Sequence, residues 1–481
     1  MLQGAAARDH RARRRWAGVS VGVTLALLLA PSGFGGSAGT HPQRAGALAQ
    51  FDAHVSHIVF IMMENHPYDN FYGEYCLQLS KFCRSTGDGI PAGTCVPYYP
   101  HTPSYGCIRP FNYSLAQLST PDLNHDWGST HVAYNSGAMN GFYQAEGDTT
   151  LPFGHYNGST IPVYWDLAEQ YGLADDFFSS AASYSLPNHW FIVSSVAPPI
   201  IEQYFPGANG VALQHQYLNE SNASPALEDE LVNSSISWKY YQFGLPSYTA
   251  ATNPAPLSVA WNLWNPMAAR AQSYTTKDKS HFVSSTTFPT DAATGNLPNI
   301  SWLIPPELYS DHPPYNVTAS QTWVASMLDA IEGSPEWNST EVFLSWDEYG
   351  GYYDHVAPPA LDAYGDGFRV PLLAIGPYVK QGFIDHALLD FGSVLHLMEK
   401  RFGLACMGPR DCNATLPLSM FNFNRAPRSP ITIPGYANAT YPMPLQSSGR
   451  LPPYNASQDP NLPSPPPGAG DDVVFADGGL G

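Results

Sequence analysis

The segment His57–Met63 (HIVFIMM) is a continuous apolar run that stops abruptly at Glu64–Asn65. A run of this length predicts a strand buried on both faces of a parallel sheet. Three later runs share the pattern and end in polar or turn-forming residues: Ile300–Ile304, Glu341–Trp346 and Val370–Ile375. The four runs together predict the core of one central sheet.

Helical patterns separate these strands. Apolar residues recur at a spacing of about 3.6 in three segments: Tyr164–Tyr171, Ser320–Ile331 and Leu388–Phe402. Strands that alternate with helices indicate an α/β fold, with a mostly parallel sheet between two helical layers. Residues 199–298 carry few such patterns and are rich in Asn, Ser and Pro, so we expect an insertion or cap over the sheet there.

The composition excludes several classes of protein. Only 13% of the 481 residues are charged, while 13% are aromatic, which favours a packed globule over a disordered chain. The formal charge of −19 leaves no broad basic surface for nucleic acid. No apolar run reaches the ~18 residues of a membrane span. Because Lys and Arg are few, the protein gains little positive charge when its carboxylates are protonated. We therefore expect the fold to tolerate acid and any activity to have its optimum at acidic pH.

The ends of the chain differ from its middle. Residues 1–47 combine arginines, an apolar stretch at Val19–Ala30 and small residues near Ala45–Ala47, as in an export leader. Residues 442–481 are rich in Pro, Ser and Gly and predict a disordered tail. A single domain is expected over 48–441, in a secreted or cell-surface protein.

Cysteines and sequons agree with export. Six cysteines in local clusters favour disulfides over a metal site because no Cys-x-x-Cys occurs, and the short loops suggest the pairs 76–83, 95–107 and 406–412 among 15 connectivities. Asn-x-Ser/Thr acceptor sites for N-glycosylation begin at eleven positions: Asn112, Asn157, Asn219, Asn222, Asn233, Asn299, Asn316, Asn338, Asn413, Asn438 and Asn455. Asn, Ser and Thr also share loops, which would raise this count without any sugar.

Two of the predicted strands end in oxygen donors. Glu64–Asn65 follows the first strand, and Asp347–Glu348 follows the run at Glu341–Trp346. The carboxyl ends of parallel strands meet at one edge, where three carboxylates would repel one another unless a cation lay between them. Oxygen donors suit a hard divalent ion, although carboxylates also bind zinc, so Ca²⁺, Zn²⁺, Mn²⁺ and Mg²⁺ stay open. Either pair alone would also fit a strand-end turn or a helix cap.

A nucleophile and its helpers are the next candidates. Ser185, before Leu186–Pro187, has the position of a helix N-cap, and a Ser hydroxyl beside a metal could attack phosphorus without a His base. His125, His312 and His355 could bind phosphoryl oxygens or protonate a leaving group. For each of these residues, taken alone, a structural role is the preferred interpretation.

Several motifs occur in an order that resembles one family. His57–Gly73, Leu123–Phe142, Ser185–His189 and Trp346–Pro359 resemble, in sequence, the motifs of the phosphoesterase family of phospholipases C and acid phosphatases. The similarity covers roughly residues 55–405. It implies a three-layer α/β/α sandwich of the alkaline phosphatase type with a metal-assisted hydroxyl nucleophile.

The resemblance also implies roles for residues. Glu64, Asn65, Asp347 and Glu348 would hold the metal, Ser185 would coordinate it and attack phosphorus, and the three histidines named above would assist. Ser in place of the Thr of many phosphodiesterase-type members, and a Pro-rich end in place of C-terminal β-domains, favour an acid phosphatase-like monoesterase with a phosphoseryl intermediate. Phospholipase C activity on phospholipid diesters is the alternative. A non-catalytic, glycosylated surface protein on the same fold is an alternative of another class.

Overall fold

The centre of the molecule is an eight-stranded sheet in the order β13-β6-β12-β11-β1-β10-β8-β9. Its strands are β1 (His57–Met63), β6 (Gly172–Ala174), β8 (Trp238–Tyr241), β9 (Phe282–Val283), β10 (Ile300–Leu303), β11 (Thr340–Trp346), β12 (Leu372–Ile375) and β13 (Phe383–Asp385). Every neighbouring pair is parallel except the two that include β12. The sheet is therefore mostly parallel, as predicted, with β12 running against its neighbours.

The computed structural model describes residues 42–78, 89–197, 225–242, 264–266, 279–362 and 364–431. Apart from Pro42, these residues belong to one compact unit, Gln43–Gly481. The predicted tail at 442–481 and residues 1–41 of the predicted leader lie outside the described residues. The leader boundary at residue 47 falls within helix α1 (Pro42–His54), whose Phe51 is buried in the core.

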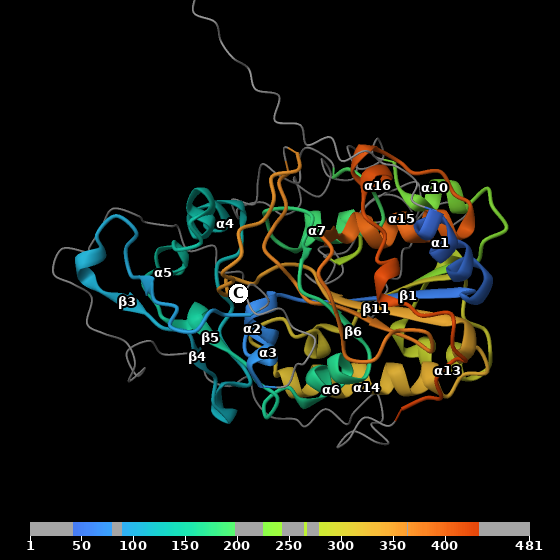
Figure 1. Cartoon of the computed structure of the whole chain (residues 1–481), viewed down its shortest axis with the longest axis horizontal. Helices are drawn as coiled ribbons and strands as arrows, with labels where there is room; N and C mark the ends of the chain where they lie inside the picture. Colours follow the sequence, from blue (N-terminus) through green and yellow to red (C-terminus); the bar gives the residue numbers. More distant parts are fainter. Residues whose placement is uncertain are drawn as a thin grey trace, which may run out of the picture. The chain divides into compact units, whose positions relative to one another are not determined.

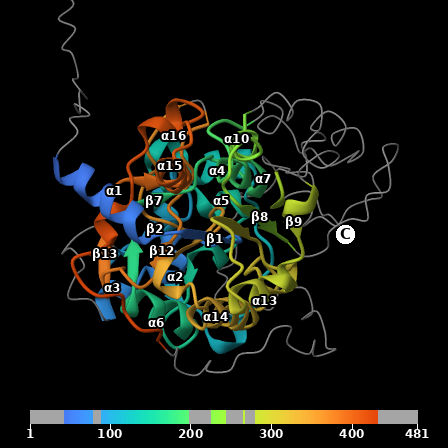
Figure 2. The same ribbon diagram turned by 90° about the vertical axis from the view of Figure 1, so that its right-hand side faces the viewer.

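Helices cover both faces of the sheet (Figures 1 and 2). One helical layer contains α7 (Ser185–Phe191), α10 (Leu227–Leu231), α15 (Phe391–Phe402) and α16 (Pro409–Asn413). The opposite layer contains α6 (Pro162–Gln170), α13 (Phe288–Ala293) and α14 (Val317–Glu332). The arrangement confirms the predicted three-layer α/β/α fold.

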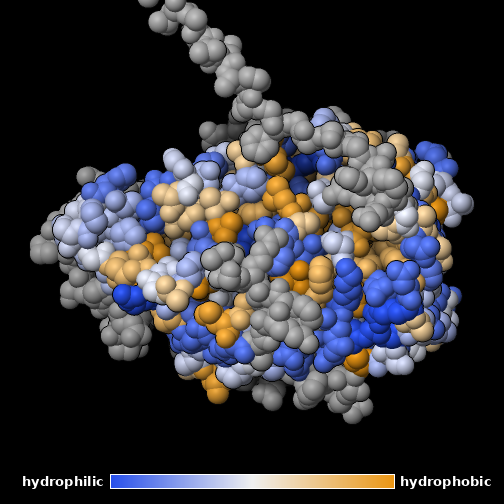
Figure 3. All heavy atoms as spheres, viewed as in Figure 1, coloured by the Kyte–Doolittle hydropathy of each residue, from blue (hydrophilic) through white to orange (hydrophobic). Residues whose placement is uncertain are grey.

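Smaller elements surround the carboxyl ends of the central strands. The short helices are α2 (Tyr68–Tyr72), α3 (Tyr75–Gln78), α4 (Trp127–Tyr134) and α5 (Phe142–Ala145). Two-residue strands form three further ladders: β2 (Val96–Pro97) with β3 (Cys107–Ile108), β4 (Phe111–Asn112) with β5 (Gly154–His155), and β7 (Phe177–Phe178) with β14 (Leu389–Asp390). On the face drawn in Figure 3, polar and apolar side chains are interspersed. Among the described residues, no helix combines the length and apolarity needed to cross a membrane.

The predicted elements coincide with observed ones. The four apolar runs correspond to β1, β10, β11 and β12, and the three helical patterns correspond to α6, α14 and α15. Residues 199–298 were expected to form an insertion or cap over the sheet. Their described parts, 225–242 and 279–298, instead contain β8 and β9, which extend the sheet, and α10 and α13, which lie beside it. The rest of 199–298 lies outside the described residues, apart from 264–266.

Two of the three expected disulfides are present. Cys95 pairs with Cys107, and Cys406 pairs with Cys412, each with a Cα–Cα distance of 5.3 Å. The expected partner of Cys76, Cys83, lies outside the described residues. The 406–412 bridge closes the turn around α16, which packs on α15.

Candidate metal centre and active site

The register of the central strands brings the two oxygen-donor pairs together. β1 and β11 run parallel with Met63 opposite Trp346, so Glu64 and Asp347 follow the same sheet edge. The backbone N–H of Asn65 donates to Asp347 Oδ1 at 2.8 Å, and that of Asp347 donates to the Met63 carbonyl at 2.9 Å. Glu64, Asn65, Asp347 and Glu348 are all fully buried. The meeting of these residues, expected from the strand ends, is thus observed.

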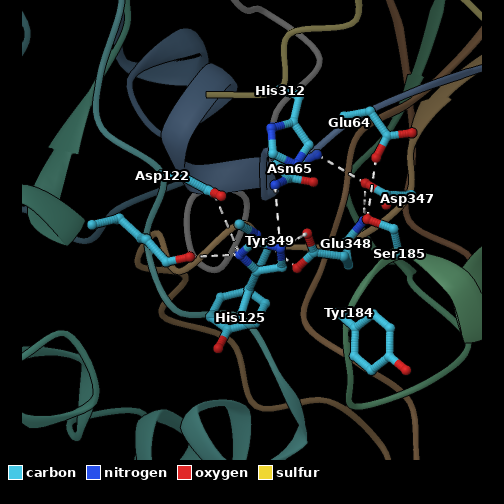
Figure 4. Close-up of polar contacts among 12 residues, drawn as sticks. Glu64, Asn65, Asp122, His125, Tyr184, Ser185, His312, Asp347, Glu348 and Tyr349 are labelled. Carbon is cyan, nitrogen blue, oxygen red and sulfur yellow. Dashed lines mark hydrogen bonds and ion pairs between the residues drawn. The ribbon is translucent and has the colours of Figure 1, made fainter. Parts of the chain in front are cut away.

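Ser185 joins this cluster from the neighbouring helical layer (Figure 4). It is the first residue of α7, and the N-cap is Tyr184, so the expected N-cap role of Ser185 is wrong by one position. Its hydroxyl does not cap the helix but donates to Glu64 Oε2 at 3.2 Å. The side chain is 3% exposed, which places a hydroxyl in direct contact with a buried carboxylate.

The electrostatics of the cluster are unfavourable without a cation. Burial, together with the charges of Asp347 and Glu348, raises the pKa of Glu64 well above its usual range. Burial also raises the pKa of Glu348 far above its usual range, against the lowering effect of His125. Carboxylates gathered in this way would be stabilised in their charged form by a positive ion.

Unpartnered oxygens indicate where an ion would fit. Among the described residues, Asn65 Oδ1, Asp347 Oδ2 and Glu348 Oε1 are buried and accept no hydrogen bond. Buried polar atoms almost always have partners, so three orphans in one cluster indicate a missing ligand. The donor set fits a divalent ion, and the group Glu64–His189–Asp347 places one ligand atom of each residue within 4.8 Å of the others.

His125 and His312 lie beside this centre (Figure 4). The Nδ1 of His125 lies 2.6 Å from the Leu123 carbonyl, and its Nε2 lies 3.5 Å from Asn65 Nδ2 and 3.9 Å from Glu348 Oε1. Burial lowers the pKa of His125, but the charges of Glu348 and Asp122 outweigh it and raise the pKa to about 9. The ring of His312 lies 6.1 Å from that of His125. Two of the three predicted histidines therefore lie beside the carboxylate cluster.

His355 lies in a different cluster. Its Nδ1 is 2.6 Å from Asp69 Oδ2, and its neighbour Asp354 binds the guanidinium of Arg369 at 3.0 Å. Arg369 is completely buried and also donates to Asp69 Oδ1. Although two carboxylates and an imidazole meet here, Arg369 already supplies the positive charge. The polar contacts of His355 are thus to Asp69 and Arg369 and not to Glu64, Asp347 or Ser185.

The sequence reasoning missed His189. This residue lies one helical turn after Ser185, is fully buried, and places Nε2 2.8 Å from Glu64 Oε1. Burial lowers its pKa to about 4, so the imidazole is neutral at pH 7. The spacing of four residues from Ser185 puts both side chains on one helix face, which was the available signal.

The fold and the buried centre define an α/β/α protein with a carboxylate, hydroxyl and imidazole site at the carboxyl ends of its strands. The model of the Phosphoesterase family matches residues 55–405. That match covers most of the chain, which therefore belongs to the phosphoesterase family.

Curated relatives carry related names. A protein named non-hemolytic phospholipase C from Pseudomonas aeruginosa is 24% identical over 82% of this chain, which spans only 60% of that relative's length. One named phospholipase C A from Mycobacterium tuberculosis is 27% identical over 78% of each chain. One named non-specific phospholipase C6 from Arabidopsis thaliana is 22% identical over 81% of this chain and 76% of that one.

Among solved structures, a protein of the alkaline phosphatase superfamily from Vibrio parahaemolyticus is 10% identical over 78% of this chain and 79% of that one. Its TM-score of 0.36 is too low to bear on the site.

Proposed function

We propose that this chain is a metal-assisted phosphoester hydrolase in which Ser185 is the nucleophile. The observation that carries the proposal is the contact of the Ser185 hydroxyl with Glu64 Oε2 inside a buried carboxylate cluster. The hydroxyl belongs to the first turn of α7, while its acceptor follows β1, so two layers of the fold are needed to form the contact. A degenerate, non-catalytic member of the family would be expected to lack one of these groups.

The candidate metal ligands are those whose oxygens meet at the strand ends: Glu64, Asn65, Ser185, Asp347 and Glu348. The orphaned oxygens of Asn65, Asp347 and Glu348 support this set. A divalent ion bound there would lower the pKa of the Ser185 hydroxyl and neutralise charge on the phosphoryl oxygens. The identity of the ion is left to measurement.

The residues themselves suggest a two-step reaction. In the first step, Ser185 Oγ forms a bond to phosphorus as its proton passes to Glu64 Oε2, and the bond from phosphorus to the ester oxygen breaks. His125, whose pKa is raised, supplies a proton to the leaving oxygen. In the second step, water attacks the phosphorus of the phosphoseryl ester and gives a proton to His125, the bond from phosphorus to Ser185 Oγ breaks, and the proton held by Glu64 returns to Ser185 Oγ. His312, beside His125, is placed to hold a phosphoryl oxygen.

The preferred substrate class is a phospholipid diester. The curated relatives described above are named phospholipases C, and the mycobacterial one has 78% of its length matched by this chain. The expectation of a phosphatase rested on Ser185 and on the Pro-rich end in place of C-terminal β-domains. The second argument is weakened because a relative named phospholipase C A is matched by this chain over 78% of its own length. A phosphate monoester is kept as the second candidate because Ser185 still supports it.

Export to the cell exterior is part of the same proposal. The leader-like sequence of residues 1–47 and the disulfides Cys95–Cys107 and Cys406–Cys412 support it, since disulfides persist in oxidising compartments. Five sequon asparagines are exposed and accessible to a glycosyltransferase: Asn112, Asn233, Asn316, Asn338 and Asn413. Asn299 differs, because its side chain bonds to Ser237 and to the Ser56 carbonyl.

The test is the substitution Ser185→Ala, with Ser183→Ala as the matched control. Both serines are buried, but only Ser185 contacts Glu64. Turnover of nitrophenyl phosphorylcholine and of nitrophenyl phosphate should fall by roughly a thousandfold or more in Ser185→Ala, with an unchanged circular dichroism spectrum. Full turnover by this variant would overturn the assignment, and the ratio of the two rates in the wild-type protein decides between diester and monoester.

A further inference from the structure

His189 of α7 also contacts the carboxylate cluster. Its Nε2 lies 2.8 Å from Glu64 Oε1 and 3.7 Å from Asp347 Oδ2, and all three side chains are fully buried. Ligand atoms around one ion, each at about 2.0–2.2 Å, lie no more than about 4.4 Å apart. The two distances fall within that limit, so a single ion between the three groups needs little rearrangement.

The orphaned oxygen of Asp347 separates two explanations of this contact. A simple imidazole–carboxylate pair would account for Glu64 and His189. Asp347 Oδ2 would then have no partner, because it is buried and accepts no hydrogen bond from the described residues. Yet this oxygen lies only 3.7 Å from the same nitrogen of His189. An ion shared by the three residues accounts for all of them.

The imidazole of His189 is buried beside another aromatic ring. Trp264, itself 3% exposed, lies nearly parallel to the imidazole, with 12° between the ring planes and 6.4 Å between their centroids. His189 lies on the same helix, α7, as Ser185, which is four positions earlier. Since His189 is fully buried on this helix, it has little conformational freedom to lose when it binds a metal.

We propose that His189 is a ligand of the ion at this centre, which thereby has a mixed nitrogen and oxygen donor set with Glu64 and Asp347. This inference rests on the proposed function and extends it to the class of metal. Imidazole suits Zn²⁺ and other first-row transition ions, whereas Ca²⁺ and Mg²⁺ prefer oxygen ligands alone. The centre therefore selects a transition ion such as Zn²⁺ over Ca²⁺.

The experiment compares wild type with His189→Gln, His396→Gln and Asp347→Asn. The carboxamide of Gln can still donate a hydrogen bond to Glu64, so a structural partner is kept while the nitrogen ligand is lost. His396, a buried histidine of α15 that lies 3.2 Å from the Ala414 carbonyl, is the matched control. Each chelator-treated protein is titrated with Zn²⁺ and separately with Ca²⁺, and bound metal is measured by elemental analysis after dialysis.

We expect His189→Gln to weaken Zn²⁺ binding by at least about tenfold while Ca²⁺ binding changes by less than about threefold. His396→Gln should behave as wild type, and Asp347→Asn should lose both ions. Unchanged Zn²⁺ affinity in His189→Gln, with loss in Asp347→Asn, would overturn the role of His189 and leave the proposed function standing. Failure of the wild type to bind any divalent ion would overturn both.

A measurement on the wild-type protein covers the case in which His189→Gln does not fold. Cu²⁺ added at one equivalent should show nitrogen hyperfine splitting in its electron paramagnetic resonance spectrum. The other candidate ligands supply oxygen atoms, but His125 and His312 lie nearby, so the spectrum is also recorded for the double variant His125→Gln with His312→Gln. Absence of nitrogen coupling in that variant would contradict the proposal.

Discussion

Asn65 has a positive φ of 62°, which turns the chain sharply after β1. The turn is possible because Gly350 packs against it. A Cβ atom on Gly350 would lie 2.2 Å from the Asn65 carbonyl oxygen, and Gly350 itself has a φ of 59°. The glycine after Asp347–Glu348 is therefore a structural requirement of the site and not only of its own loop.

Gly350→Ala should consequently damage the metal centre. The added methyl group must displace the Asn65 backbone, so we expect a loss of divalent-ion affinity of at least about tenfold and of stability of about 2–3 kcal/mol. Gly403→Ala is the matched control, because Gly403 also has a positive φ of 67° but has no atom within 4 Å of the added Cβ. The control should cost about 1 kcal/mol and leave metal binding unchanged. Equal metal affinity in the two variants would show that the turn at Asn65 does not depend on Gly350.

The carboxylates at the strand ends could be predicted from the sequence, but the residues that complete the site from α7 could not. Glu64 and Asp347 follow long apolar runs, so the sequence alone placed them at one edge of the sheet. His189 and Ser185 share a helix face, yet nothing local to residues 185–189 indicates that this face points at Glu64. That contact depends on how α7 packs on the sheet, which is a property of the tertiary structure.

At the scale of elements, strand length decided what the sequence could predict. β1 and β11 have seven residues each and were recognised from continuous apolar runs. β6, β9 and β13 have two or three residues, which is too short for any periodicity to emerge. Their strand conformation is imposed by pairing with a formed neighbour and not by local preference.

The clamp formed by Asp69, Asp354, His355 and Arg369 joins separate elements. Asp69 lies in α2, Asp354 and His355 follow β11, and Arg369 precedes β12 and also donates to the Asp175 carbonyl beyond β6. The clamp fixes α2, which begins three residues after Asn65, against the loop that follows Asp347–Glu348. His355 contacts Asp69 within this clamp, so we propose that it helps to position α2, and the catalytic role expected from its motif stays a prediction.

Arg369→Met tests this clamp. Removal of the guanidinium leaves two buried carboxylates without their main counter-charge, so the free energy of unfolding should fall by about 3–5 kcal/mol. The double variant Arg369→Met with Asp354→Asn should recover part of that loss because one of the uncompensated charges is gone. Arg109→Met, at an exposed arginine, should change stability by less than about 0.5 kcal/mol. Urea unfolding gives these values, and a loss in Arg369→Met no larger than in Arg109→Met would contradict the clamp.

At the scale of the whole molecule, charged residues are few, yet some of the acids outside the metal centre are buried. Burial raises the pKa of Glu332 to about 7 and that of Glu399 to about 9. The charge of Asp411 adds to the effect at Glu399. In the unfolded chain both groups would titrate near 4.5, so between that pH and the raised values the folded state binds more protons than the unfolded state.

This linkage fixes the sign of the pH dependence. Stability falls as pH rises wherever the folded state holds extra protons. Between about pH 6.5 and pH 9 the raised pKa of Glu399 therefore lowers stability as pH rises. Below about pH 6.5, His66 opposes this effect, because burial lowers its pKa to about 4 and stability is lost as the unfolded chain takes up that proton. We therefore expect the melting temperature to fall as pH rises from about 6.5 to 9.

Glu399→Gln isolates one contributor to this profile. Gln is neutral at every pH and close to Glu in size, so the variant should melt at a higher temperature than wild type at pH 8.5 and at nearly the same temperature at pH 5. Because metal binding affects both proteins equally, the difference between their melting curves reports Glu399 alone. Glu169→Gln, at a half-buried position of α6, serves as the control and should follow the wild-type profile. A constant offset between Glu399→Gln and wild type from pH 5 to 9 would show that Glu399 is not the proton-binding group, and that the stability of this acidic chain is set elsewhere.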